Sequence, residues 1–206
     1  MNSSRIDPGG RAVQGLTTFL SFVVLNILFL VACLPVITLG AAGSALLEVT
    51  LRYADEERGY LVKDFVLALG RNALRATAVH LLLSIPMLLL GFAAAFWLML
   101  DSPLSLMAAL VAGLGAVYLL AALIHGLALV AAFDAGIGRT LRNALLLPGA
   151  EPLRTMGLVL IPVTGLALVL IMPVLGWILV TIGCSFGAYL MALLLRPVHS
   201  RHAGAA

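Results

Sequence analysis

Three ionisable side chains lie inside otherwise apolar stretches of this sequence: Glu48, His80 and His125. In a lipid environment ionisable groups are expensive to bury, so they are functional candidates by default. Counted from the polar ends of their segments, His80 and His125 lie roughly 8 to 12 Å deep, because a helix rises 1.5 Å per residue. Imidazole titrates near neutral pH, so two histidines at similar depth, together with Glu48, could relay protons or hold a cation.

A structural interpretation competes with this one. The three residues come from three different segments and have no local ligand spacing, which favours separate hydrogen bonds to carbonyls or hydroxyls inside a helix bundle. Asn26 and Thr38 complete the candidate binding residues. An amide such as Asn26 within an apolar helix usually bonds to a neighbouring helix, and Thr38 follows the break at Pro35.

Motifs that carry catalysis are absent from the sequence. It contains no HExxH, no glycine-rich phosphate loop and no GxSxG elbow. Cys33 and Cys184 lie far apart in apolar runs without a CxxC pair, which indicates two small buried hydrophobic residues. We therefore expect no catalytic residues, no metal, no cofactor and no enzyme.

The composition indicates a membrane protein. Hydrophobic residues make up 63% of the 206 residues and charged residues 10%, with a mean hydropathy of +1.15; soluble domains carry about 25% charged residues. The net charge of +3 does not indicate nucleic acid, because the basic residues lie at the ends of apolar segments and form no stripe. We expect the lipid bilayer as a partner and no nucleic acid.

The apolar segments predict an all-α fold: a polytopic helical membrane protein with about five to six hydrophobic segments in one bundle. About 20 apolar residues cross the hydrocarbon core, so residues 1–206 suit one integral membrane domain. The predicted segments are 13–34, 36–51, 73–100, 104–133 and a charge-free stretch, 156–195, that must reverse near Met172, Pro173 and Gly176.

The second segment, 36–51, is short. Pro35 disfavours helix in the residue before it, and the 16 residues that follow give roughly 24 Å of helix. The segment could be a short, tilted or broken helix that returns to the cytoplasm, or a re-entrant segment that leaves on the side where it entered. In either case the small residues from Gly40 to Ala45 predict the closest helix contact in the chain.

Charged residues concentrate in the connections. Residues 52–72 predict a cytoplasmic connection with an amphipathic helix along the interface, because Leu61, Phe65 and Ala68 recur at helical spacing. Residues 133–153 predict a second polar connection, and 1–12 and 196–206 predict cytoplasmic tails. If 36–51 returns, all 12 Lys and Arg residues lie on one side, opposite the turns at Pro35, Pro103 and Pro173, which predicts cytoplasmic N- and C-termini.

Residues 71–74, Arg-Asn-Ala-Leu, recur as residues 142–145, each time before an apolar segment that contains Ile-Pro. One interpretation is a parallel duplication, as in some transporters. The other is a shared entry signal, in which a basic residue lies at the interface and Asn caps the helix.

Several of these residues together resemble the YesL-like family of bacterial membrane proteins. The resemblance covers most of the chain and is most specific at Leu34, Pro35, Thr38, Gly40 and Ala41, followed by Lys63, Asp64, Phe65, Asn72 and Asn143. Leu69 and Ala73 depart from it, since aromatic residues are expected there. It implies a domain of unknown function in the bacterial plasma membrane, often encoded near carbohydrate uptake systems, with no site residues to carry over.

Two functions follow as expectations. The first is a noncatalytic accessory or assembly factor of carbohydrate transport, whose partner is a membrane component of the transport system or a second copy of the chain. The small-residue pairs Gly91/Ala95 and Ala112/Ala116 suit such packing. The alternative is a small transporter or channel with a site near the Pro35 break.

Overall fold

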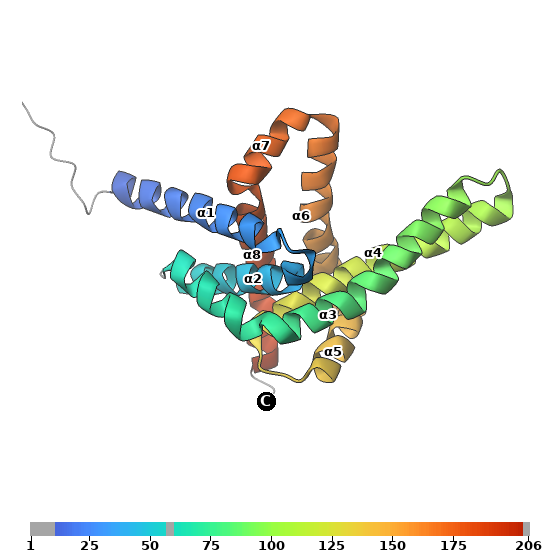
Figure 1. Ribbon diagram of the computed structural model, residues 1–206. Helices are drawn as coiled ribbons and strands as arrows, with labels where there is room; N and C mark the ends of the chain where they lie inside the picture. The colour runs from blue at the N-terminus through green and yellow to red at the C-terminus, as the bar shows by residue number, and fades with distance from the viewer. Residues whose placement is uncertain (1–10, 57–59, 204–206) are drawn as a thin grey trace, which may run out of the picture.

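The computed structural model describes residues 11–56 and 60–203, and every regular element in those ranges is helical (Figure 1). Five helical stretches are long and apolar enough to cross a membrane. The predicted all-α polytopic fold is therefore confirmed. The principal helices are α1 (Arg11–Cys33), α2 (Leu39–Glu56), α3 (Leu61–Leu98), α4 (Pro103–Ala132), α5 (Ile137–Ala150), α6 (Pro152–Ile171), α7 (Gly176–Ile178) and α8 (Cys184–Ala203).

The predicted reversals lie where proline and glycine interrupt the apolar runs. The chain turns between α3 and α4 at residues 99–102, and Pro103 opens α4 at a position where its missing N–H costs nothing. After α6, a short 3₁₀ turn at Pro173–Leu175 leads into α7. One π-helical turn, Leu179–Gly183, then joins α7 to α8.

Helix α2 is the most enclosed element of the fold. It contacts α1, α3, α4 and α8, and nearly every side chain from Gly40 to Leu51 is buried. Three aromatic rings, Phe22, Tyr53 and Tyr189, meet edge to face at centroid distances of 5.4 to 5.9 Å and tie α2 to α1 and α8. The short segment that follows Pro35 is thus the centre of the core.

The Pro35 turn packs beside the first half of α3. Thr77 Oγ1 donates to the carbonyl of Ile37 across 3.3 Å, so the turn lies beside Thr77, only two residues beyond Arg75. From there α3 continues for 21 residues to Leu98, roughly 32 Å. That the turns at Pro35 and Pro103 lie on the same side of the membrane stays a prediction.

The charged connection 52–72 is shorter than predicted. Helix α2 continues to Glu56 and α3 begins at Leu61, so the expected amphipathic helix and the following span form one helix of 38 residues. Leu61, Phe65 and Ala68 do share a buried face, but that face belongs to the main apolar core. This face packs on protein.

The second polar connection contains a helix that was not predicted, α5. Thr140, Ala144 and Pro148 recur every four residues and are buried, which is the pattern of one helix face. The tail predicted from residue 196 continues α8 to Ala203, and the tail predicted at residues 1–12 lies largely outside the described residues.

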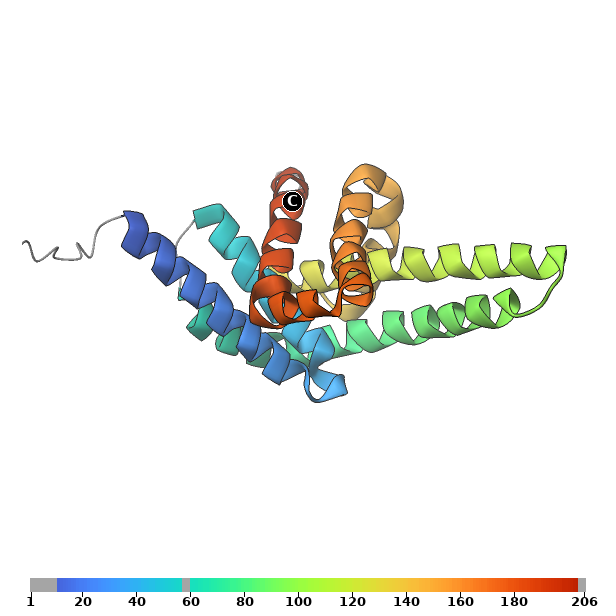
Figure 2. The ribbon, with the colours of Figure 1, turned by 90° about the horizontal axis from the view of Figure 1, so that it is seen from above.

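The helices leave this core in different directions (Figure 2). Helices α3 and α4 form a long hairpin, and α6 to α8 form a second, shorter one. Between Ile85 and Leu120, only Ser105 and Ala109 are buried. We call this far half of the α3–α4 hairpin, residues 85–120, the arm; most of its surface is exposed, and Tyr118 at its base donates a hydrogen bond to the carbonyl of Leu145 on α5.

Candidate functional site

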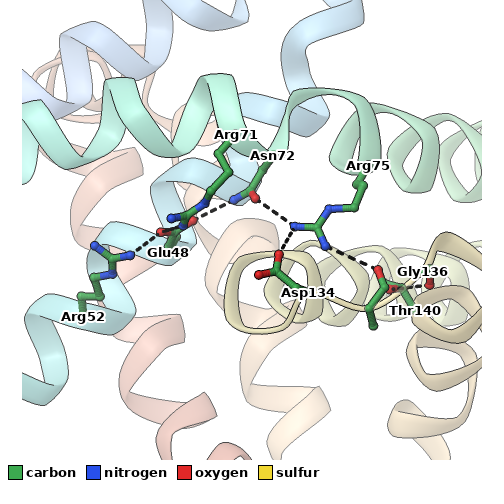
Figure 3. A network of polar contacts seen from close by, with 9 residues as sticks. Glu48, Arg52, Arg71, Asn72, Arg75, Asp134, Gly136 and Thr140 are labelled. Atoms are coloured by element: carbon green, nitrogen blue, oxygen red, sulfur yellow. Dashed lines mark hydrogen bonds and ion pairs between the residues drawn. The ribbon is translucent and has the colours of Figure 1, made fainter.

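The buried carboxylate of Glu48 is the centre of a polar cluster (Figure 3). Its side chain, on α2, is only 5% exposed. Oε1 accepts hydrogen bonds from Arg71 and, across 2.9 Å, from Arg52, while Oε2 accepts one from Asn72 Nδ2 at 2.7 Å. A buried carboxylate is stable when such donors satisfy its oxygens, so this cluster fixes α2 against α3.

Arg75 extends the cluster to the end of α4. Its guanidinium donates to Asp134 Oδ1 across 2.7 Å and to Asn72 Oδ1 across 3.3 Å (Figure 3). Asp134 lies just after α4, so one chain of contacts joins α2, α3 and the α4–α5 link. We call this region, with Arg71, Arg75 and Asp134, the charged end of the molecule.

Helices α2 and α3 pack antiparallel, and the residues in contact recur along each helix at multiples of four residues. Glu48 meets Asn72, and eight residues away a Cβ on Gly40 would lie 2.5 Å from His80 Cβ and 2.6 Å from the carbonyl oxygen of Ala76. Ser44 lies midway on the same α2 face. The prediction of close approach at 40–45 is confirmed, because only glycine fits at residue 40.

Two buried polar atoms along this interface have no hydrogen-bond partner among the described residues: Ser44 Oγ and His80 Nδ1. Buried polar atoms are nearly always satisfied by protein or by water. A bridging water or a small polar ligand would satisfy these two atoms of the polar row Glu48, Ser44 and His80.

His125 lies on a different interface. Its Nε2 is 2.9 Å from the hydroxyl of Thr155 at the start of α6, and the ring is buried. The structural interpretation of the histidines predicts such a hydrogen bond to a hydroxyl inside the bundle. His80 packs on α2 and His125 on α6, so the two histidines have different partners.

A cavity of about 580 Å³ adjoins His125. Its walls come from the end of α4, the α4–α5 link, α5 and α8. The lining residues are His125, Ala128, Leu129, Phe133, Asp134, Ala135, Arg139, Thr140, Asn143, Leu146, Leu147, Ala150 and Leu195. Neither Asn26 nor Thr38 is among them.

Asn26 joins two helices. Its Nδ2 donates to the carbonyls of Leu179 and Val180 at 3.1 and 2.6 Å, and its Oδ1 accepts from the backbone N–H of Ser185 at 2.9 Å. These are groups in and after the π-helical turn, where the regular α-helical ladder is interrupted. The amide thus acts between helices, as its position in an apolar segment predicts.

Thr38 closes the turn after α1. Its hydroxyl lies 2.5 Å from the carbonyl oxygen of Ala32 and 2.7 Å from that of Pro35. With both contacts directed to local backbone, this side chain stabilises the Pro35 turn.

The five candidates therefore occupy separate places, and the structure does not gather Glu48, His80 and His125 into one site. Among the described residues, no three His, Cys, Asp or Glu side chains could hold one metal ion. Sequence reasoning missed Arg52, Arg71 and Asn72 as partners of Glu48. The available signal was the Arg71-Asn72 pair of the short repeat.

The two copies of that repeat have different surroundings. Asn72 is buried against Glu48, whereas Asn143 is exposed and lines the cavity. Neither caps a helix, because Tyr60 precedes α3 and Gly136 precedes α5. The interpretation of these asparagines as helix caps is wrong.

One protein-family model matches part of this sequence. Searches of curated proteins and of solved structures found no match. Residues 22–100, from α1 to the end of the arm's first helix, match the family described as "Protein of unknown function, DUF624". The YesL-like resemblance is consistent with this match, which covers less than half of the 206 residues.

Proposed function

We propose that this protein is a noncatalytic accessory or assembly factor of a membrane transport system for carbohydrates. The observation that carries the proposal is the arm. Its two helices extend from the core with exposed apolar side chains along most of their outer surface.

The arm is built to pack against other transmembrane helices. Helix α3 measures roughly 57 Å and α4 roughly 45 Å, both longer than a hydrocarbon core of about 30 Å. Gly91 on its surface has no atom within 4 Å of the place a Cβ would occupy. Small residues at such positions allow another helix backbone to approach closely.

The polar groups of the core support a noncatalytic role. The Glu48 carboxylate and the Asn26 amide are fully engaged in joining helices. A catalytic acid or base would need a free atom within reach of a substrate.

The resemblance to the YesL-like family supports carbohydrate transport and the bacterial plasma membrane. The charged end, rich in arginine, would face the cytoplasm by the positive-inside rule. The predicted cytoplasmic placement of both termini requires α2 to cross the membrane. The Pro35 turn beside Thr77 favours the alternative, in which both ends of α2 lie toward the charged end, and cysteine labelling decides between the two.

Photocrosslinking in native cells tests the accessory role. A benzoylphenylalanine replaces Phe92 on the arm, 73% exposed, or Leu170 on α6, 74% exposed, as a matched control. We expect the Phe92 position to yield an adduct with a membrane subunit of a carbohydrate transporter and the Leu170 position to yield none. Adducts only with lipid or with a second copy, or equal adducts at both positions, would contradict the proposal.

A small transporter is the second candidate. The cavity beside His125 and the unsatisfied atoms of Ser44 and His80 favour it, although the site is not at the Pro35 break. Proteoliposomes that hold only this protein would then take up a labelled sugar. Uptake equal to that of empty liposomes would contradict this candidate.

A further inference from the structure

The cavity beside α5 has a polar wall and an apolar wall. Arg139, Thr140 and Asn143 lie on the polar side, and Leu129, Leu147 and Leu195 contribute apolar surface. Its volume of about 580 Å³ lies within the range of small-molecule sites. A ligand that satisfies both walls must be amphiphilic.

The charges around the cavity favour an anion. Asp134 is bound to Arg75 across 2.7 Å, so its negative charge is already compensated. Arg139 is exposed and makes no hydrogen bond or ion pair with the described part of the chain. Two arginines against one aspartate leave a local charge of +1, with the Arg139 guanidinium able to donate to an anionic oxygen.

The location of the cavity favours a lipid. Its lining combines Asp134 of the charged end with apolar residues of α4, α5 and α8. Helix α5 itself has Arg139 and Arg142 on its exposed surface, beside exposed leucines such as Leu146. A phospholipid in the adjoining leaflet presents its phosphate and its acyl chains at this boundary. Basic pockets between transmembrane helices bind anionic head groups in this way.

We propose that this cavity binds an anionic phospholipid, with Arg139 and Asn143 at the phosphate and the leucines of α4, α5 and α8 against the upper part of an acyl chain. The inference rests on the cavity alone and is independent of the accessory role of the arm.

Native mass spectrometry of the full chain in neutral detergent tests it, with dioleoyl phosphatidylglycerol and dioleoyl phosphatidylcholine as probes. We expect at least tenfold tighter retention of phosphatidylglycerol. Arg139→Gln should weaken that retention about tenfold, since it removes a charged hydrogen bond. Arg142→Gln is the matched control, because Arg142 lies on the same helix, is exposed and does not line the cavity; it should change retention less than twofold.

Three results would overturn the proposal. They are equal retention of the two lipids by the unmodified protein, equal weakening by Arg139→Gln and Arg142→Gln, and competition by free glycerol 1-phosphate as strong as that by the lipid. Arg139 is exposed, so Arg139→Gln should unfold at the same temperature as the unmodified protein without lipid, which separates loss of binding from loss of fold.

Discussion

Asn72 donates a hydrogen bond of 2.7 Å from its Nδ2 to Oε2 of Glu48. Both residues are buried at the interface between α2 and α3. A carboxylate at this depth requires its donors, because an uncompensated buried charge is strongly destabilising. The contact therefore explains how a helix with a charge in its middle can form the centre of an apolar core.

Glu48→Gln should lower the free energy of unfolding by about 1 to 3 kcal/mol, because the neutral amide leaves Arg71 and Asn72 with a poorer acceptor. Asp134→Asn is the matched control, since Asp134 also pairs with an arginine but is 90% exposed. It should lose less than about 1 kcal/mol, as exposed pairs do. Reversible unfolding in detergent measures both, and equal losses would contradict the role of burial.

Gly40→Ala should destabilise the fold by about 1 to 3 kcal/mol, as overpacking does. Its Cβ would press on the Ala76 carbonyl oxygen at 2.6 Å, and this backbone cannot move aside easily. Gly70→Ala on α3 should instead stabilise by up to about 1 kcal/mol, because the site is open and alanine favours helix. The same unfolding assay measures both variants, and we expect the free energy of unfolding to fall for Gly40→Ala and to rise for Gly70→Ala. Destabilisation of similar size at both positions would contradict the close packing at Gly40.

The amide of Asn26 should control the π-helical turn. Asn26→Leu leaves two carbonyls and the Ser185 N–H without their side-chain partner, at a cost of about 1 to 3 kcal/mol. Hydrogen–deuterium exchange should increase selectively at residues 179–185. Ser21→Ala, which removes only an exposed bond to Thr17, should leave that exchange unchanged. Unaltered exchange in the Asn26 variant would show that the turn does not depend on the amide.

Much of the fold follows from local rules that the sequence displays. Pro103 and Pro173 mark reversals because each opens a new helical segment, where the missing N–H of proline costs no hydrogen bond. The charge-free stretch 156–195 is too long for one span. Asn26 bonds between helices because an amide in an apolar segment has few other partners. Each of these outcomes depends on one short stretch of chain.

What the sequence could not predict depends on which helices become neighbours. Arg71 and Asn72 meet Glu48 only through the antiparallel packing of α2 on α3. Asp134 meets Arg75 only because α4 packs beside α3. The cavity forms because α5, read as a polar connection, folds as a helix beside α4. The level of the Pro35 turn depends on the same packing, which hydropathy does not encode.

The central claim is that α2 lies at the charged end, with the Pro35 turn level with Thr77 and far from the hairpin tip. Single cysteines in a background without Cys33 and Cys184 test it by reaction with a membrane-impermeant maleimide in intact and in permeabilised cells. The test position is Leu34, whose side chain is 79% exposed. Asp101 is the reference for the hairpin tip, and Asp134 is the reference for the charged end. We predict that Asp101→Cys reacts in intact cells, while Leu34→Cys and Asp134→Cys are protected until permeabilisation. Reaction of Leu34→Cys in intact cells together with Asp101→Cys would contradict the account.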